Sequence, residues 1–227
     1  MIAKAPIYKA PAVQAVYNWT GFYIGGHLGA ELGITSWTFV GAGTTTDPRF
    51  AGFLGGGEIG YNYQVGKWVF GVQGDVSWTN ARGARSCPNG FFYNCEIDVT
   101  WLSTTTARIG YAYWDRLLVY VKGGAAIARD RAQFVCDTGS RPTIVPLVGC
   151  PSQSDSKTKA GWTVGWGSEF GLTQNVSVNG EIMYFNLGTE RRNLAGILAD
   201  VQRDGFTSTV GLRFRFGEIA NAAGGTP

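Results

Sequence analysis

The sequence predicts an all-β protein, an eight-stranded antiparallel up-and-down β-barrel that crosses a membrane. Three observations predict it: eight segments alternate with a period of two, the connections between them alternate in length, and charges are scarce. Charged residues make up 15% of the 227 residues, aromatic residues 14%, and 34 residues are Gly. A typical soluble chain carries about 25% charged residues. No run of about 18 apolar residues provides a transmembrane helix.

The alternation separates an apolar face from a small or polar one. In the first segment Phe22, Ile24 and Leu28 alternate with Tyr23 and His27, the pattern of a strand between two different environments. The same split recurs over residues 53–64, 68–78, 98–111, 117–127, 162–170, 176–184 and 206–216. Segments of this length cross a bilayer at a tilt.

The connections alternate between tight turns and long loops. The turns are Gln64–Lys67, Tyr113–Arg116 and Thr173–Asn175, and the loops span 32–52, 80–97, 129–160 and 188–205. Periplasmic turns and long extracellular loops are typical of outer-membrane barrels, and an even strand count puts both termini in the periplasm. We therefore expect a periplasmic Ala/Pro-rich leader at 1–17, the barrel at 18–216 and a C-terminal tail at 217–227. The start has no apolar signal core, so we expect export through a signal peptide that is cleaved and not present in this chain.

The last long loop departs from the period of two. Helical spacing there predicts a short amphipathic helix, carried by Leu194, Ile197, Leu198 and Val201.

A soluble lipocalin-like barrel is the structural alternative, but its outer face would carry many Lys and Glu. Here the polar face is mostly Gly, Ser, Thr and Ala, which suits a narrow lumen. Its charges balance, and paired charges are the ones that persist when buried. We predict a lumen charge network of Glu58, Asp75, Asp98, Arg108, Lys122, Glu169, Glu181, Arg213 and Arg215.

Aromatic residues gather at both ends of the apolar face, as in the two interfacial girdles of a membrane barrel. The predicted girdle residues are Trp19, Tyr61, Tyr63, Trp68, Phe70, Tyr111, Trp114 and Phe216 near the turns, and Trp78, Trp101, Trp162 and Phe206 near the loops.

Four cysteines fall in two predicted loops. Cys87, Cys95, Cys136 and Cys150 allow three pairings, and the one that closes each loop on itself is Cys87–Cys95 with Cys136–Cys150. Closing a loop of about 15 residues removes roughly 3 kcal/mol of entropy from the unfolded chain. The spacing lacks the C-x-x-C pattern of a metal site.

Catalytic, cofactor, metal and nucleic-acid sites are not expected. His27 is the single histidine; we expect it in the lumen with no serine beside it, away from any lipid substrate. The basic residues are scattered rather than clustered, which disfavours nucleic acid. Arg82, Arg85, Arg191, Arg192 and Arg203 lie in predicted loops, where lipopolysaccharide phosphates or solvent are the alternative partners.

Several motifs resemble the small outer-membrane β-barrel proteins of alphaproteobacteria, the opacity-like, RopB-type relatives of the OmpA membrane domain. They are Tyr17–Gly25, Ala107–Ala112, Val119–Ala126, Gly165–Gly171, Glu181–Leu187 and Gly211–Phe216. The resemblance implies insertion by the barrel-assembly machinery, with Phe216 as the terminal aromatic signal. This chain departs from the pattern because it continues for eleven residues beyond Phe216.

These features predict a structural, surface-exposed outer-membrane protein that contributes to envelope integrity and is not an enzyme. A narrow porin for small solutes is the first alternative, and a lipid-modifying enzyme is the weaker one. The expected partners are outer-membrane lipids and lipopolysaccharide, the barrel-assembly machinery, and peptidoglycan or other envelope proteins.

Overall fold

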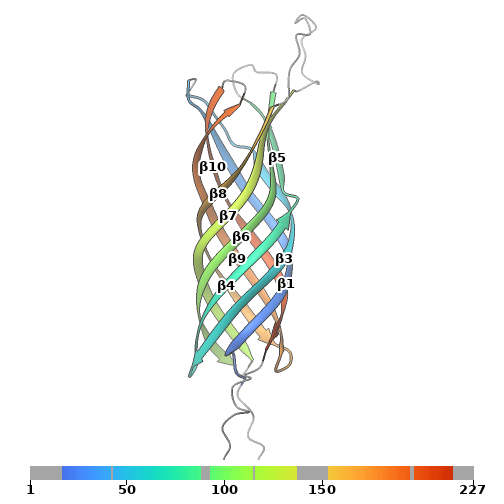
Figure 1. Cartoon of the computed structure of the whole chain (residues 1–227), viewed down its shortest axis with the longest axis vertical. Coiled ribbons are helices and arrows are strands. Elements are labelled where there is room, and N and C mark those ends of the chain that lie inside the picture. Colours follow the sequence, from blue (N-terminus) through green and yellow to red (C-terminus); the bar gives the residue numbers. More distant parts are fainter. Residues whose placement is uncertain are drawn as a thin grey trace, which may run out of the picture.

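The chain folds into one closed antiparallel barrel in a computed structural model, which describes residues 17–41, 43–87, 93–114, 116–136, 153–194 and 197–216. Ten β-strands are present in this part of the chain (Figure 1). They are β1 (Gly21–Phe39), β2 (Thr45–Thr46), β3 (Arg49–Val65), β4 (Trp68–Thr79), β5 (Arg82–Ser86), β6 (Tyr93–Trp114), β7 (Leu117–Cys136), β8 (Gln153–Gly171), β9 (Val176–Leu194) and β10 (Ile197–Arg215). Among the described residues, no helix is long and apolar enough to cross a membrane.

Eight strands make the ring, as the sequence predicts. β1 closes it because it pairs with both β10 and β3, and each other ring strand pairs with its sequence neighbours. β5 continues the path of β4 after a two-residue break, since both pair with β3 and β6. β2 is a two-residue addition to the edge of β1.

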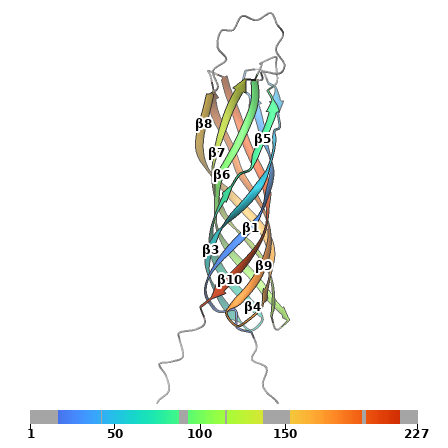
Figure 2. The ribbon, with the colours of Figure 1, turned by 90° about the vertical axis from the view of Figure 1, so that its right-hand side faces the viewer.

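The three tight turns lie together at one end of the barrel, here called the turn end, and the opposite end is the loop end. β3 and β4 are joined through Gly66, whose φ of 60° suits glycine. Figures 1 and 2 show that the long strands of the ring run between these ends, and that the first and last described segments lie at the turn end.

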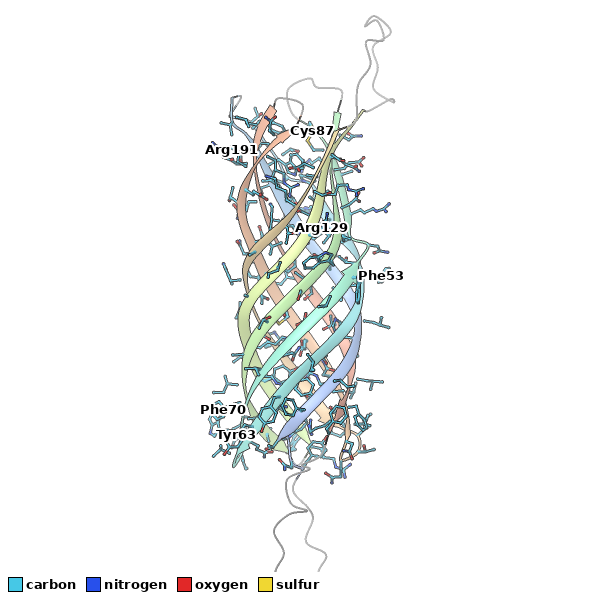
Figure 3. The ribbon with its side chains drawn as sticks, viewed as in Figure 1. Phe53, Tyr63, Phe70, Cys87, Arg129 and Arg191 are labelled. Carbon is cyan, nitrogen blue, oxygen red and sulfur yellow. A yellow bond between two sulfur atoms is a disulfide. The ribbon has the colours of Figure 1, made fainter. Side chains whose placement is uncertain are left out.

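The outer wall carries two aromatic rings that delimit the part of the barrel facing lipid. Phe53 and Tyr63 on β3, Trp68 and Trp78 on β4, and Phe206 and Phe216 near β10 are three outward-facing pairs. The members of each pair are ten residues apart, about 34 Å along a strand. At the usual tilt this corresponds to an apolar band of about 25 Å. Figure 3 shows Phe53 at the upper ring and Tyr63 and Phe70 at the lower one.

Trp19 does not belong to the lower ring, contrary to the prediction, because its side chain is fully buried inside the barrel. The segment before β1 folds into the mouth at the turn end, where an indole finds a cation rather than lipid.

The strands continue well beyond the upper ring, so the predicted loops at 32–52, 80–97, 129–160 and 188–205 are too long. β9, for example, runs ten residues past Tyr184, which adds about 20–25 Å of wall at the usual tilt. The prediction failed because the apolar face of the strands changes from the outside of the barrel to the inside above the upper ring. Above the ring the inner side of the wall is apolar and forms a core that includes Trp37, Phe50, Ile97 and Val201.

The predicted helix around Leu194–Val201 is wrong for the same reason. Val201 is fully buried while Leu198 is 43% exposed, so these residues alternate across the wall of β10. Apolar residues at this spacing fit a strand whose inner side packs in a core and whose outer side meets water.

We expect a cysteine introduced at the exposed Thr38 on β1 to react with a membrane-impermeant thiol reagent on intact cells, because this wall stands outside the bilayer. A Val210→Cys variant, 64% exposed between the rings, is the matched control and should stay unlabelled. The readout is a mass shift on a gel, with the unsubstituted protein as background. Protection of Thr38→Cys would place the membrane higher on the barrel than the aromatic rings do.

Candidate functional site: the ion-paired lumen

One arginine lies at the centre of the lower lumen. The guanidinium of Arg213, fully buried, donates to Glu58 Oε1, Glu169 Oε2 and Glu181 Oε1, each at 2.6 Å. These acids come from β3, β8 and β9, so one side chain of β10 joins four strands across the lumen. A fork of five N–H donors is suited to binding several carboxylates at once.

Further cations neutralise the remaining charge around Arg213. Arg108 lies 3.5 Å from Glu169, Arg215 lies 3.0 Å from the same carboxylate, and Lys122 pairs with Glu181. Asp75 accepts a hydrogen bond of 2.5 Å from Thr104. Four acids and four bases of the predicted network thus meet in this layer, here called the lower layer: Glu58, Asp75, Glu169, Glu181, Arg108, Lys122, Arg213 and Arg215.

Asp98 does not join the lower layer, contrary to the prediction. The pairing of β6 with β7 shifts between Val99 and Trp101, and such a bulge reverses the side to which the following residues point. Val99 consequently points inward at 3% exposure. Asp98 lies on the outer wall, where its carboxylate is 3.2 Å from Arg82.

Inward-facing glycines provide the space for these large polar groups. A Cβ at Gly60 would lie 2.2 Å from the Tyr23 hydroxyl, and one at Gly25 would lie 2.8 Å from Glu58 Oε1. Tyr23 in turn stacks against Arg108 and Arg213 at 4.8 and 5.1 Å. The high glycine content is therefore part of how the lumen holds its charges.

His27 has a serine partner that sequence reasoning missed. Its Nε2 lies 2.7 Å from Ser77 Oγ. In the register of the sheet, Gly56 on β3 stands between His27 on β1 and Ser77 on β4. Because Gly56 has no side chain, the two residues meet across the intervening strand, a contact that the spacing of one strand cannot reveal.

The His27–Ser77 pair lines a cavity of about 30 Å³ above the lower layer, together with Asp75, Thr104 and Lys122. This volume holds about two water molecules. A hydroxyl beside an imidazole is the beginning of a nucleophilic site, but a lipid or peptide substrate is far too large for this space. The geometry instead suits a hydrogen-bonded structural histidine.

A second buried ionic layer, the upper layer, lies inside the wall above the upper ring. Arg203 Nη2 is 2.5 Å from Glu31 Oε1, and Arg192 Nη2 is 2.6 Å from Asp130 Oδ1. Arg203 also packs its guanidinium over the ring of Phe50 at 4.8 Å. Sequence reasoning placed both arginines in a loop on the surface, whereas the structure buries both completely. The alternation of inward and outward residues continues through β9 and β10, and this pattern in the sequence could have predicted their burial.

The other predicted surface arginines are exposed. Arg191 donates to both carboxylate oxygens of Asp200 at 2.8 and 3.0 Å, and this hydrogen bonding on the exposed loop end lowers the pKa of the Asp200 carboxyl. Arg85 donates to the Asp47 carbonyl at 3.3 Å.

Two aromatic residues close the lumen at the turn end. Tyr17 and Trp19, both buried, lie 5.2 and 4.7 Å from the guanidinium of Arg215. Trp19 is fixed by a 2.7 Å hydrogen bond from its backbone N–H to Gln64. Tyr17, the last residue of the predicted leader, is thus packed inside the barrel. The rest of that leader and the tail at 217–227 lie outside the described residues.

Cys87 and Cys95 form a disulfide at the loop end, with Cα atoms 5.3 Å apart. The bond joins the end of β5 to β6, consistent with the usual geometry of such bridges. Cys136 is the last residue of β7, and Cys150, its predicted disulfide partner, lies outside the described residues. Phe216, the predicted assembly signal, is 45% exposed, and its N–H donates to the Phe22 carbonyl at 2.9 Å.

We expect Arg213→Met to lower the free energy of unfolding by about 3–5 kcal/mol, because three glutamates would lose their shared cation in a low dielectric. Urea unfolding in detergent, followed by tryptophan fluorescence, measures the change. Arg191→Met removes the same charge at an exposed pair and should leave the free energy of unfolding nearly unchanged. Equal effects of the two substitutions would show that the lower layer does not stabilise the barrel.

Known proteins resemble this chain over most of its length. It is 30% identical over 229 residues to a 31 kDa outer-membrane immunogenic protein of Brucella melitensis, covering 95% of this chain and 91% of that protein. It is 28% identical to a 22 kDa outer membrane protein of Rhizobium leguminosarum, over 78% of this chain and 67% of that protein. The crystal structure of OprG from Pseudomonas aeruginosa has the same fold, with a TM-score of 0.55 and 12% identity over 88% of this chain and 97% of that one. The model of the outer membrane protein beta-barrel domain family matches residues 7–214, so the chain belongs to this family and is an outer-membrane protein.

Proposed function

We propose that this protein is a structural barrel that strengthens the outer membrane and presents a rigid wall outside the cell without conducting solutes. The observation that carries the proposal is the occupied lumen. From the turn end upward it holds Tyr17 and Trp19, the lower layer, a cavity of about 30 Å³ and the upper layer. A water-filled pore has no room beside these groups, because an eight-stranded barrel is only wide enough for its own side chains.

The orientation follows the rule for outer-membrane barrels, in which tight turns face the periplasm. The upper layer, the Cys87–Cys95 disulfide and the wall above the upper ring then lie outside the cell. A disulfide fits a protein that is exported through an oxidising compartment. Lipopolysaccharide, the barrel-assembly machinery and peptidoglycan remain the proposed partners, with Phe216 as the assembly signal.

Neither alternative function gains support from the geometry. A narrow porin would need a continuous aqueous path through both ionic layers. An enzyme would need access to the His27–Ser77 pair, which faces a cavity with room for about two waters.

The purified wild-type barrel should show no steady ion conductance in a planar lipid bilayer. A conducting porin tested in the same bilayer verifies the assay, and the shift between unheated and boiled samples on a gel verifies folding. A reproducible open state of fixed conductance in the wild-type protein would contradict the structural function and support the porin.

A strain that lacks this protein should be more sensitive to detergents and to large antibiotics that an intact outer membrane excludes, and the wild-type gene should restore resistance. A His27→Ala, Ser77→Ala variant should restore it equally, because the proposed function uses no catalysis. Failure of this variant at normal abundance in the membrane would instead support an enzymatic function.

A further inference from the structure

The outer wall just above the upper ring carries two arginines without counter-ions. Arg129 and Arg131 are two residues apart on β7, so both point outward from the same face. Among the described residues, no carboxylate lies within 4 Å of either guanidinium. Asp98 is the register partner of Arg131, but it forms its ion pair with Arg82 at 3.2 Å instead.

Hydroxyl groups and apolar side chains surround these arginines in an ordered way. The register partners on β8 are Thr158 for Arg129 and Ser156 for Arg131, and Arg131 Nε donates to Ser156 Oγ at 3.3 Å. Below them, Ile127 is 41% exposed on the same face of β7. Trp101 is the register partner of Arg129 on β6.

The position along the barrel axis matches the boundary between acyl chains and head groups. Figure 3 places Arg129 above Phe53, a residue of the upper ring, and below Cys87 and Arg191 at the loop end. Arginine binds phosphate oxygens in pairs through its planar fork. The hydroxyl groups can form hydrogen bonds with sugars. The apolar side chains below them provide a surface for acyl chains.

The neighbouring part of the wall, which begins with β9 beside β8, differs. On β9 and β10 the outward-facing charges above the upper ring are Arg191, Asp200 and Asp204 among the described residues, and Arg191 is already held by Asp200. A phosphorylated head group would meet excess negative charge there. The outer wall is therefore suited to anionic lipid over β7 and β8 and unsuited to it over β9 and β10.

We propose that Arg129 and Arg131, with Ser156 and Thr158, bind the phosphate of a phosphorylated glycolipid in the outer leaflet, with its acyl chains along Ile127 and Trp101. This inference deepens the proposed function, on which it rests for the orientation of the barrel. It assigns the lipid contact to β7 and β8 rather than to the arginines of the loop end.

Native mass spectrometry of the detergent-purified barrel, titrated with bisphosphorylated lipid A, tests the site. Arg129→Gln with Arg131→Gln should weaken binding about tenfold or more, since two charge-assisted contacts are lost. Arg191→Gln is the matched control, with the same kind of change on the neighbouring strand β9 at an arginine that Asp200 already pairs, and it should bind within twofold of the wild type. The gel shift on boiling confirms that each variant is folded.

Four results would overturn the inference. The first is equal binding by the double variant and the wild type, and the second is equal weakening by Arg191→Gln. The third is unchanged wild-type affinity for lipid A stripped of its phosphates. Full competition by millimolar inorganic phosphate would also overturn it, because the site would then select a free anion rather than a lipid. Conductance of the same samples stays a separate readout: a conducting wild type contradicts the structural function whether or not lipid A binds.

Discussion

The shared pairing of Arg213 with three glutamates is the interaction on which the rest of this barrel depends. An isolated ion in a narrow, poorly hydrated lumen costs several kcal/mol, so each charge must meet a partner from another strand. Arg213 meets Glu58, Glu169 and Glu181 from three different strands. These contacts fix the register around the ring, and inward glycines such as Gly25 and Gly60 are required because a larger residue would occupy the space of a charged one.

The outer wall faces lipid between the aromatic rings and water above them. This explains why the apolar residues change from the outer to the inner side along the strands. Between the aromatic rings the outer side chains contact lipid, so apolar residues such as Val210 point outward and the polar groups gather inside. Above the upper ring the outer side meets water, so Trp37 and Val201 turn inward and Thr38 outward. The upper part is thus built like a soluble barrel with an apolar core, in which the pairs of Arg203 with Glu31 and Arg192 with Asp130 are embedded.

Alternation along single strands was enough to predict the fold and the side to which most lumen residues point. It could not predict what depends on neighbouring strands. The bulge near Val99 places Asp98 on the outer wall, and Ser77 reaches His27 only because Gly56 separates them. The extent of the strands was missed because a uniform apolar-outward rule was applied where the outer solvent changes. The spacing of Leu198 and Val201 then suggested a helix, although the exposed fractions of their side chains are those of a strand.

Because the lumen is filled, the residues that can bind other molecules lie on the outer surface of the barrel. The interior groups are committed to one another: Arg213 to its glutamates, Arg203 to Glu31, Arg215 to Tyr17 and Trp19. Their ion pairs hold the strands in one arrangement, and a rigid wall can keep side chains such as Arg129 and Arg131 at a constant height above the apolar band. A flexible loop could not do this, because each bound lipid would then have to order the loop as well. The long regular strands beyond the membrane therefore give this closed barrel an outer surface of fixed geometry.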